Sequence, residues 1–258
     1  MTPPLAPSPV GPDYYLRPEV VRRYAGQSTL QRAEQVILGR IGERRLAASR
    51  VLDLGVGGGR TTAALAGRCR GYVGVDLSEP MIAACRQRFP GLRLEVADAR
   101  ALPFADAAFD LVLFSFNGID LVGDAAQRRQ VLAECARVLA PGGAMIHSSH
   151  NLNWLDSRAA VRWAGSLRVY LETQHFWGRM RRLNRDRLRQ AGAGPVELID
   201  PCNGGATRYL RPEAMIDECR AAGWRRVHLF DLAGHERVDG PEIAAARDPW
   251  LYLMSEGR

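Results

Sequence analysis

Residues 51–60 read Val-Leu-Asp-Leu-Gly-Val-Gly-Gly-Gly-Arg, and this stretch decides the fold class of the chain. The apolar run Arg50–Leu54 predicts a buried strand, the glycines predict a tight turn, and Thr61–Ala66 predicts the helix that follows. Glycine lets the backbone turn sharply and approach a bound molecule closely. The free N–H groups at the start of the helix favour an anionic ligand. The stretch therefore indicates a strand–turn–helix unit with a nucleotide-type ligand.

Outward from this turn, strand and helix patterns alternate. Upstream, Ser28–Gln31 predicts a capping box that opens an amphipathic helix. Downstream, Asp76 ends the second predicted strand, where a carboxylate can bind ribose hydroxyls. The further strands are predicted at Tyr72–Val75, Leu92–Val96, Phe109–Ser115 and Ala144–Ser149, with helices after Ser78 and over Val131–Leu139. This alternation implies a parallel sheet covered by helices on both faces.

The alternation stops after the fifth strand. Asn151 to about Arg208 is predicted to be a helical insertion with a loop over Gly192–Gly205. Its aromatic residues are Trp154, Trp163, Tyr170, Phe176 and Trp177. After it, Pro212–Ala222 predicts a helix, and Arg226–Leu232 and Trp250–Met254 predict the last two strands.

The composition fits an ordinary globular protein with a sizeable core. The chain has 258 residues, of which 47% are hydrophobic and 24% charged. No apolar run approaches the ~18 residues of a membrane-spanning helix, the Pro-rich start lacks a secretory signal pattern, and the five cysteines contain no CxxC pair. These features predict a cytoplasmic protein without a metal site.

The net charge is +7, and all 35 basic residues are Arg. Exclusive use of Arg beside abundant Ala and Gly is typical of GC-rich coding, so the basicity reflects either composition or a polyanion-binding surface. The missing Lys excludes a P-loop, a pyridoxal-phosphate Schiff base and the Tyr-xxx-Lys pair of dehydrogenases.

Arg60 stands where the dinucleotide-binding fingerprint has its third glycine. Gly55, Gly57 and Gly59 after Asp53 instead resemble the first motif of the class I S-adenosylmethionine-dependent methyltransferases. The resemblance runs from about Tyr24 to Ser149, with weaker support to Met254, and it rests on Val51–Arg60, Tyr72–Met81, Val96–Ala99, Phe109–Asp120 and Arg137–Gly143. It implies a doubly wound, seven-stranded, mostly parallel Rossmann-like α/β sheet with a helical insertion after the fifth strand. It also implies S-adenosyl-L-methionine as cofactor and S-adenosyl-L-homocysteine as product.

We accordingly divide the chain into four parts. Residues 1–12 are predicted to be a disordered N-terminus, and 13–150 to hold the N-terminal helices and the cofactor-binding part of the Rossmann-like domain. Residues 151–208 are predicted to be a helical lid or insertion on the acceptor side, and 209–258 the C-terminal helix and the last two strands. A monomer or a homodimer is expected.

The resemblance implies a set of cofactor-binding residues: Asp53, Gly55, Val56, Gly57 and Gly59 around the methionine and ribose, Asp76 on the ribose hydroxyls, Leu77 and Met81 against the adenine, Asp98 and Ala99 on its polar edge, and Ser115 and Phe116 at the methionine end. Two of these have structural alternatives. Met81 can equally be a core residue of its helix, and Asp98 can be a cap at the end of its strand.

The acceptor side is less defined. Phe114–Asp120 follows the fourth strand but is not the Asn-Pro-Pro-aromatic signature of amino-purine or glutamine methyltransferases. Asn117 is predicted either to orient the acceptor or to support its loop, and Asp120 to be a base or the N-cap of a short turn. His150, at the end of the fifth strand where ligands bind in such sheets, is the preferred candidate for a catalytic base. A structural histidine bonded to the backbone is an equal alternative for this residue.

Two further histidines bear on this choice. The spacing of His147 and His150 places them on opposite faces of the strand, so at most one faces the cleft. His175, beside Phe176 and Trp177 in the insertion, is a second candidate base.

The densest charge lies within the insertion, at Arg179, Arg181, Arg182, Arg185, Arg187 and Arg189. It is either a solvated helix face or a surface for an anionic acceptor or RNA phosphates. The favoured function is transfer of a methyl group to an oxygen or nitrogen of a small molecule in specialised metabolism, with the insertion as a mobile lid. The alternatives are an RNA-modifying methyltransferase and a non-catalytic cofactor-binding regulatory or scaffold protein. Arg60 and the missing Lys oppose a nicotinamide oxidoreductase.

Overall fold

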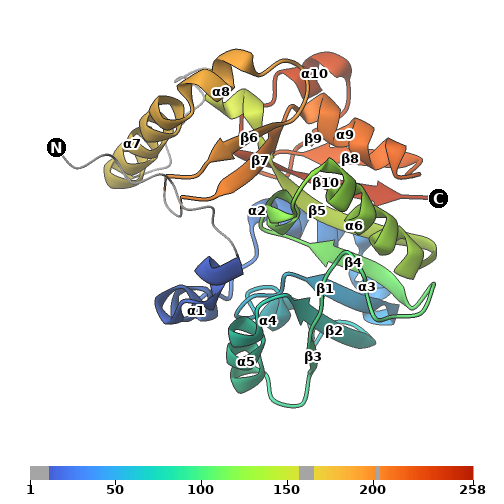
Figure 1. Cartoon of the computed structure of the whole chain (residues 1–258). Helices are drawn as coiled ribbons and strands as arrows, with labels where there is room; N and C mark the ends of the chain where they lie inside the picture. Colours follow the sequence, from blue (N-terminus) through green and yellow to red (C-terminus); the bar gives the residue numbers. More distant parts are fainter. Residues whose placement is uncertain (1–11, 157–165, 202–203, 258) are drawn as a thin grey trace.

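The computed structural model describes residues 12–156, 166–201 and 204–257 (Figure 1). These residues form one sheet whose strands are β1 (Arg50–Leu54), β2 (Gly71–Asp76), β3 (Arg93–Val96), β4 (Phe109–Phe114), β5 (Leu139–Asn151), β6 (Val196–Ile199), β7 (Ala206–Leu210), β8 (Arg226–Phe230), β9 (Glu236–Arg237) and β10 (Trp250–Glu256). The main order is β3-β2-β1-β4-β5-β10-β8-β9, and the β6–β7 hairpin joins at β5.

The first five strands pair in parallel, as the alternating pattern predicts. β10 lies between β5 and β8 and runs antiparallel to both. Two expectations need correction. The described residues contain ten strands rather than seven, and outside the five strands around β1 the pairs are antiparallel except that of β7 with β5. The additional strands are the hairpin β6–β7 and the two-residue β9, which is too short for a sequence pattern to predict.

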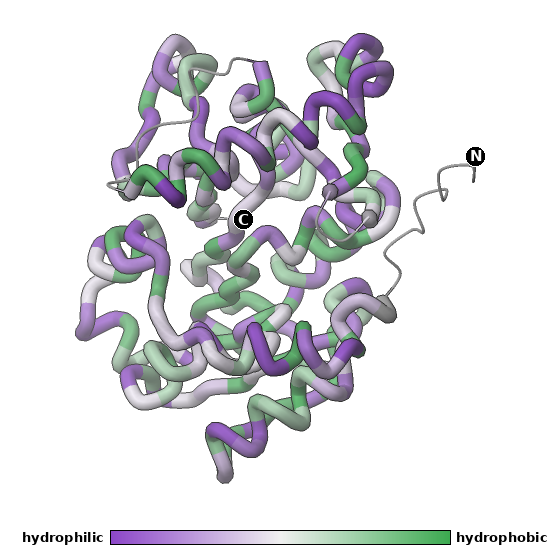
Figure 2. Tube along the Cα trace, turned by 90° about the vertical axis from the view of Figure 1, so that its left-hand side faces the viewer, coloured by the Kyte–Doolittle hydropathy of each residue, from purple (hydrophilic) through white to green (hydrophobic). Residues whose placement is uncertain are grey.

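Helices cover both faces of the sheet. The helices are α1 (Pro18–Ala25), α2 (Arg32–Ile41), α3 (Glu43–Ala48), α4 (Thr62–Leu65), α5 (Glu79–Arg88), α6 (Ala125–Val138), α7 (Leu167–Leu183), α8 (Arg185–Gln190), α9 (Pro212–Ala221) and α10 (Gly240–Ala244), with short 3-10 turns η1 (Pro12–Leu16), η2 (Gly118–Leu121) and η3 (Leu152–Leu155). Along β1, Val51 packs with α2 and α5, whereas Leu52 packs on the other face with α6 and α9. Figure 2 shows hydrophobic stretches gathered inside the molecule and hydrophilic ones mostly at its periphery.

The helix predicted after Ser28–Gln31 is α2, and it begins later than the sequence predicts. Its capping box joins Gln31 and Glu34 rather than Ser28 and Gln31, because the Glu34 carboxylate accepts the Gln31 backbone N–H (2.6 Å). Glu34 also binds Arg60 from the glycine turn, which fixes it at this position. The start of α2 is therefore set by a long-range ion pair that local patterning does not reveal.

The insertion contributes to the sheet as well as forming helices. The predicted loop over Gly192–Gly205 contains β6, and the predicted boundary at residue 208 falls inside β7. β6 pairs antiparallel with β7, and β7 pairs in parallel with the end of β5. Glycines on both sides of Val196–Ile199 conceal this short strand, which is stabilised by pairing rather than by propensity.

The helices of the insertion pack on η3 and this hairpin through a small core of their own (Figure 1). Trp154, Met180 and Leu198 are buried in it, and the Trp177 indole donates to the Trp154 carbonyl (3.0 Å). Asn184, between α7 and α8, is buried and bonds both the amide and the carbonyl of Ile199 in β6 (2.7 and 2.9 Å). Trp163 lies outside the described residues, and the mobility of the insertion stays a prediction.

Candidate functional site

The glycine turn has a backbone that only glycine adopts without strain. Gly55, Gly57 and Gly59 have φ values of 61°, 55° and 92°. A side chain at Gly59 would in addition meet Phe89 and Cys85 of α5. The buried Val56 donates its N–H to the Val75 carbonyl (3.0 Å), which ties the turn to β2. The turn therefore presents main chain to the open end of the sheet.

Asp76, at the end of β2, closes one side of this turn. One carboxylate oxygen accepts the Gly57 N–H and the other accepts the Ser78 N–H, both at 2.8 Å. Burial raises the pKa of Asp76, whereas these two N–H bonds lower it. Because each carboxylate oxygen has a second lone pair, both can still accept a hydroxyl from a ligand.

The expected adenine contacts divide into two groups. Leu77 is 58% exposed and can contact an adenine. Met81 is buried with Tyr14 and Val20 beneath the N-terminal segment, by which we mean residues 12–27, so the structure favours its core role. Val96, which is the register partner of Asp76 in β3, is 48% exposed and adds an apolar surface that the sequence argument missed.

Asp98 and Ala99 lie just past β3, at the neighbouring strand end. Asp98 accepts the Arg100 backbone N–H (2.8 Å) and pairs in two-pronged fashion with its guanidinium, and this hydrogen bonding lowers the Asp98 pKa. Asp98 therefore caps the end of its strand, as one of the two predictions stated. An adenine bound to Asp98 would have to share the carboxylate with Arg100. Ala99 is half-buried.

Asp53 lies beneath the turn and is fully buried. One of its oxygens accepts hydrogen bonds from the Thr61 hydroxyl (2.5 Å) and the Tyr72 hydroxyl (2.6 Å). Burial raises the pKa of Asp53 to about 6, although both hydroxyls lower it. Asp53 thus holds the helix start and β2 against β1, and it also borders the cleft at the turn.

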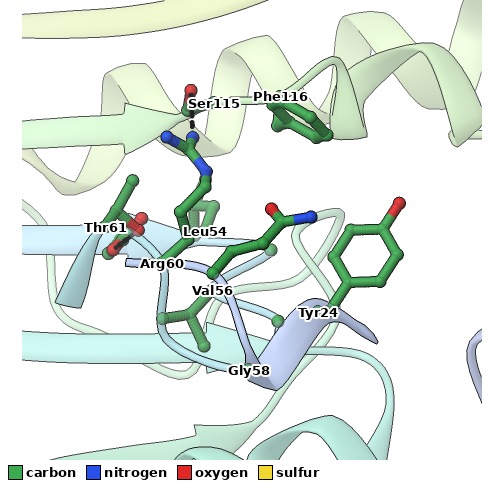
Figure 3. A pocket seen from close by; sticks show the side chains of 12 residues that line it. Tyr24, Leu54, Val56, Gly58, Arg60, Thr61, Ser115 and Phe116 are labelled. Carbon is green, nitrogen blue, oxygen red and sulfur yellow. Dashed lines mark hydrogen bonds between the residues drawn. The ribbon is translucent and has the colours of Figure 1, made fainter. Parts of the chain in front are cut away.

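A buried ion pair stands beside the turn. The Arg60 guanidinium binds both Glu34 oxygens (2.8 and 2.7 Å) and donates to Ser115 Oγ (3.1 Å), as Figure 3 shows for Ser115. The Tyr252 hydroxyl donates to the same Glu34 carboxylate (3.1 Å). Burial raises the pKa of Glu34, but Arg60 outweighs it and holds the pKa below its usual value. Ser115, expected at the methionine end, is thus joined to a network whose other members the sequence argument did not name.

The cleft at the turn is closed on its outer side by the N-terminal segment. Tyr24 and Gln27 line it together with Gly57, Arg60, Ser115 and Phe116 (Figure 3). Gly58 lies against this segment, because a side chain there would come within 2.5 Å of the Ala25 nitrogen. Arg88 of α5 donates to the Gly58 carbonyl and to the Gln27 carbonyl, and so bridges the two. The extra glycine of the turn serves the contact with the N-terminal segment.

The loop after β4 has an unusual backbone. Phe116 and Asn117 have φ values of 58° and 61°, the left-handed region that non-glycine residues adopt only at a cost. The Asn117 N–H donates to Ser148 Oγ (2.8 Å), and the Asn117 amide nitrogen lies 3.3 Å from His150 Nε2. Asn117 therefore supports its loop and also contacts the predicted base.

Asp120 and His150 form a pair. One Asp120 oxygen accepts the His150 backbone N–H (2.6 Å) and lies 2.8 Å from His150 Nδ1. The other accepts Arg128 (2.6 Å) and Ser149 Oγ (2.7 Å). Asp120 is fully buried and lies inside the short turn η2, whose N-cap position is Asn117, so Asp120 is not the cap of this turn. Its predicted role as a base stays a prediction.

The electrostatics of the pair give each member a separate role. Burial raises the pKa of Asp120, but Arg128 and His150 outweigh it, so the pKa lies below its usual value and the group is a permanent anion that orients the imidazole. His150 keeps 22% of its side chain exposed at the end of β5.

The two other candidate histidines lie elsewhere. His147 is buried near Cys219 in the core, and burial lowers its pKa to about 3, which removes it as a base. His175 is exposed on α7. Of the predicted bases, His150 alone has a buried carboxylate partner among the described residues.

The arginine cluster is partly structural. Arg179, Arg181 and Arg187 donate to the backbone carbonyls of Pro201, Leu155 and Glu197. Arg181, Arg182, Arg185 and Arg189 line a cleft of ≈ 350 Å³ together with Leu188. In the part of the chain that the structure describes, no helix has the length and apolarity to cross a membrane, and no group of three or more metal-binding side chains is present.

The sequence of the chain is similar to those of known methyltransferases. Residues 51–143 match the "Methyltransferase domain" family. A malonyl-[acyl-carrier protein] O-methyltransferase of Halorhodospira halophila is 32% identical over 213 residues, which cover 78% of this chain and 67% of that protein. A demethylmenaquinone methyltransferase of Thermus thermophilus is 41% identical over 106 residues, which cover 39% of this chain and 46% of that protein. The chain thus spans less than half the length of this second relative.

Among solved structures, the 1,6-didemethyltoxoflavin-N1-methyltransferase of Burkholderia thailandensis, with 1,6-didemethyltoxoflavin and S-adenosylhomocysteine bound, has a TM-score of 0.57. It is 17% identical, and the alignment covers 100% of this chain and 93% of that one. At this identity the likeness concerns the fold.

The raised pKa of Asp53 predicts a pH-dependent stability. The folded state binds this proton more tightly than the unfolded state, so the Asp53 contribution is fully present below about pH 4 and is lost as the pH rises to about 6. Relative to Asp53→Asn, the free energy of unfolding of the wild type should fall by about 3 kcal/mol across this window. Denaturant titrations at several pH values measure it, with the exposed Asp186→Asn as control. A pH-independent difference between wild type and Asp53→Asn would contradict the assignment.

Gly58→Ala should loosen the N-terminal segment, because the new methyl group would overlap the Ala25 backbone. We expect a loss of about 1–3 kcal/mol in stability and faster hydrogen exchange in α1, measured by thermal unfolding and mass spectrometry. Gly67→Ala is the matched control, since a side chain there meets open space. Equal behaviour of the two variants would refute the contact.

Proposed function

Because the chain belongs to the class I S-adenosylmethionine-dependent methyltransferases, we propose that it transfers a methyl group to an oxygen or nitrogen of a small-molecule acceptor, with His150 as the base. The observation that carries the proposal is the pair Asp120–His150, at the end of β5 beside the loop that follows β4. Ligands of such sheets bind at this end of the strands.

The described residues fit the cofactor. In the proposed arrangement, Asp76 accepts the two ribose hydroxyls with the lone pairs that Gly57 and Ser78 leave free. The main chain of Gly55–Gly59 lies along the methionine part, Leu77 and Val96 flank the adenine, and Asp98 and Ala99 meet its polar edge. Arg60 is neutralised by Glu34, which suits a site for a positively charged sulfonium, because an unpaired cation there would repel it.

The bound cofactor supplies a methyl group on a sulfonium, so the protein itself has to align the acceptor, exclude water and remove a proton. His150 Nδ1–H donates to Asp120, which leaves Nε2 unprotonated and able to take the proton that the acceptor loses. Asp120 then stabilises the imidazolium, because it stays ionised through its contact with Arg128. Asn117 can turn its amide so that the oxygen accepts from the protonated Nε2.

The insertion supplies the wall of the acceptor site in this proposal. Tyr209 lies beside His150, with ring centroids 4.8 Å apart and ring planes tilted by 35°. It belongs to β7, the strand in which the insertion ends, so this strand contacts the base directly. The names of the relatives specify three different acceptors, demethylmenaquinone, a malonyl carrier protein and 1,6-didemethyltoxoflavin. The family match ends at residue 143, before the insertion, which agrees with an acceptor specificity that resides in 151–208.

The arginine cleft on α7 and α8 is the observation that favours the alternative, an RNA acceptor. Against it, three arginines of the cluster are engaged by backbone carbonyls. A regulatory protein without activity would have no use for a buried Asp120 that orients a partly exposed histidine. We therefore retain the small-molecule acceptor.

For the cofactor, we expect wild-type protein to bind S-adenosylhomocysteine and not NAD. Asp76→Ala should weaken the binding of S-adenosylhomocysteine by about 1.5–3 kcal/mol, since hydrogen bonds to a charged group are lost. Isothermal titration calorimetry measures the affinity, and Asp106→Ala, which removes an exposed carboxylate elsewhere, is the control. Wild-type affinity in a folded Asp76→Ala protein would exclude the ribose contact.

For the transfer step, methyl-deuterated S-adenosylmethionine is incubated with a panel of phenols, amines and carboxylic acids, and labelled products are identified by mass spectrometry. On the acceptor found, His150→Ala should reduce turnover about 10²–10⁴-fold and leave the affinity for S-adenosylhomocysteine unchanged. His175→Ala, which removes an exposed histidine of α7, should have wild-type turnover. Unchanged turnover in His150→Ala would remove it as the base.

A further inference from the structure

Three ring side chains form a row across the end of β5. Tyr209 in β7 and Trp250 in β10 are both register partners of His150, one on each side of it. Partners in register project from the same face of a sheet, so the three rings lie side by side. Phe116 approaches Trp250 edge-on, with centroids 6.1 Å apart, and the Arg60 guanidinium lies 5.0 Å from the Phe116 ring. Phe116 therefore links this row to the cleft at the glycine turn.

The side-chain amide of Asn117 uses its nitrogen in a hydrogen bond but not its oxygen. With Nδ1–H of His150 donating to Asp120, Nε2 has a lone pair that the amide N–H of Asn117 can meet and the amide oxygen cannot (3.3 Å), and this sets the orientation of the Asn117 side chain before an acceptor binds. Asn117 is 7% exposed, and its Oδ1 is buried without a hydrogen-bond partner among the described residues. Leaving such an oxygen unpaired costs folding free energy, which a ligand donor would recover.

The indole of Trp250 has the complementary property. Its Nε1–H is also buried and lacks a partner within the described ranges. An indole nitrogen can only donate. The same applies to Trp224, but that indole is in the core between α9 and β8, away from His150. The row at the end of β5 thus combines an unused acceptor, Asn117 Oδ1, with an unused donor, Trp250 Nε1.

We propose that Asn117 Oδ1 and Trp250 Nε1 recognise the acceptor molecule, and that this molecule is a planar hydroxy- or amino-carbonyl compound. Its O–H or N–H donates to Asn117, and its carbonyl oxygen accepts from Trp250. The rings of Phe116, which is 37% exposed, and of the half-buried Trp250 present flat apolar surfaces, which favour a conjugated body over a flexible chain, whereas Tyr209 is buried beside His150. The inference rests on the proposed function, in that the O–H or N–H held by Asn117 beside His150 is the group that is methylated. Its proton passes to His150 Nε2, whose lone pair the Asn117 amide N–H releases when the amide turns.

Three planar bicyclic probes separate these contacts. 7-Hydroxycoumarin has both a hydroxyl and a carbonyl, coumarin lacks the hydroxyl, and 2-naphthol lacks the carbonyl. Affinities are measured by fluorescence or calorimetry below neutral pH, with S-adenosylhomocysteine present. We expect 7-hydroxycoumarin to bind at least about tenfold more tightly than the other two, since each lacks one hydrogen bond.

Two variants assign the contacts to residues. Trp250→Phe keeps an aromatic ring and should weaken 7-hydroxycoumarin and coumarin about tenfold, with 2-naphthol unchanged. Asn117→Gly removes the amide at a positive φ without strain, and should weaken the two hydroxyl compounds but not coumarin. Trp224→Phe is the matched control, because it removes the other unpaired indole and should leave all three affinities unchanged. Thermal unfolding and S-adenosylhomocysteine affinity verify that each variant is folded.

Equal affinity for the three probes, absence of binding by all of them, or identical effects of Trp250→Phe and Trp224→Phe would overturn the inference. These outcomes are separate from failure of the proposed function, which is decided by labelled methyl transfer and the His150 variant. A protein that transfers methyl groups but treats the three probes alike would retain its proposed activity and lose this recognition.

Discussion

The carboxylate of Glu34 has almost no contact with water, and four separate parts of the chain bind it. Arg60 comes from the glycine turn, Ser115 from the end of β4, Tyr252 from β10 and the Gln31 N–H from the start of α2. A buried charge is tolerated only when its partners are all in place. Glu34 therefore fixes three elements relative to one another: the glycine turn, the end of β4 and β10. The cofactor cleft and the acceptor side are held in place by the same carboxylate.

Asp120 repeats this arrangement on the other side of the site. It too is a buried carboxylate, and it accepts hydrogen bonds from Arg128, Ser149 and the His150 backbone. Arg128 Nε also donates to Glu218 of α9 (2.5 Å). Buried ion pairs contribute little to net stability, because desolvation offsets the attraction. Their contribution here is to geometry: each holds one polar group of the site, Ser115 in one case and His150 in the other, in a single orientation.

The sequence predicts well what depends on local pattern. The glycine turn, Asp76 at the end of β2, the Ser78 cap and the parallel half of the sheet all follow from periodicity and from residues close in the chain. Features that depend on distant partners do not follow from the local pattern. β6 exists through its pairing with β7, Met81 is buried because the N-terminal segment covers it, and the role of Asp120 depends on Arg128 and His150, neither adjacent to it in the chain. The position of Trp250 opposite His150 likewise depends on strand pairing, and nothing in its neighbourhood in the sequence indicates it.

The pairing of β7 with β5 also restricts how this scaffold could be recombined. Because His150 and Tyr209 are neighbours in one hydrogen-bonded ladder, the segment between them is a loop closed by the sheet itself. An exchange of this segment with a relative that cuts at residue 208 would divide β7 and shift its register by whatever the graft adds or removes. A crossover after Leu210 keeps β7 whole, so a chimaera made there would exchange the acceptor wall together with the strand that pairs beside the histidine.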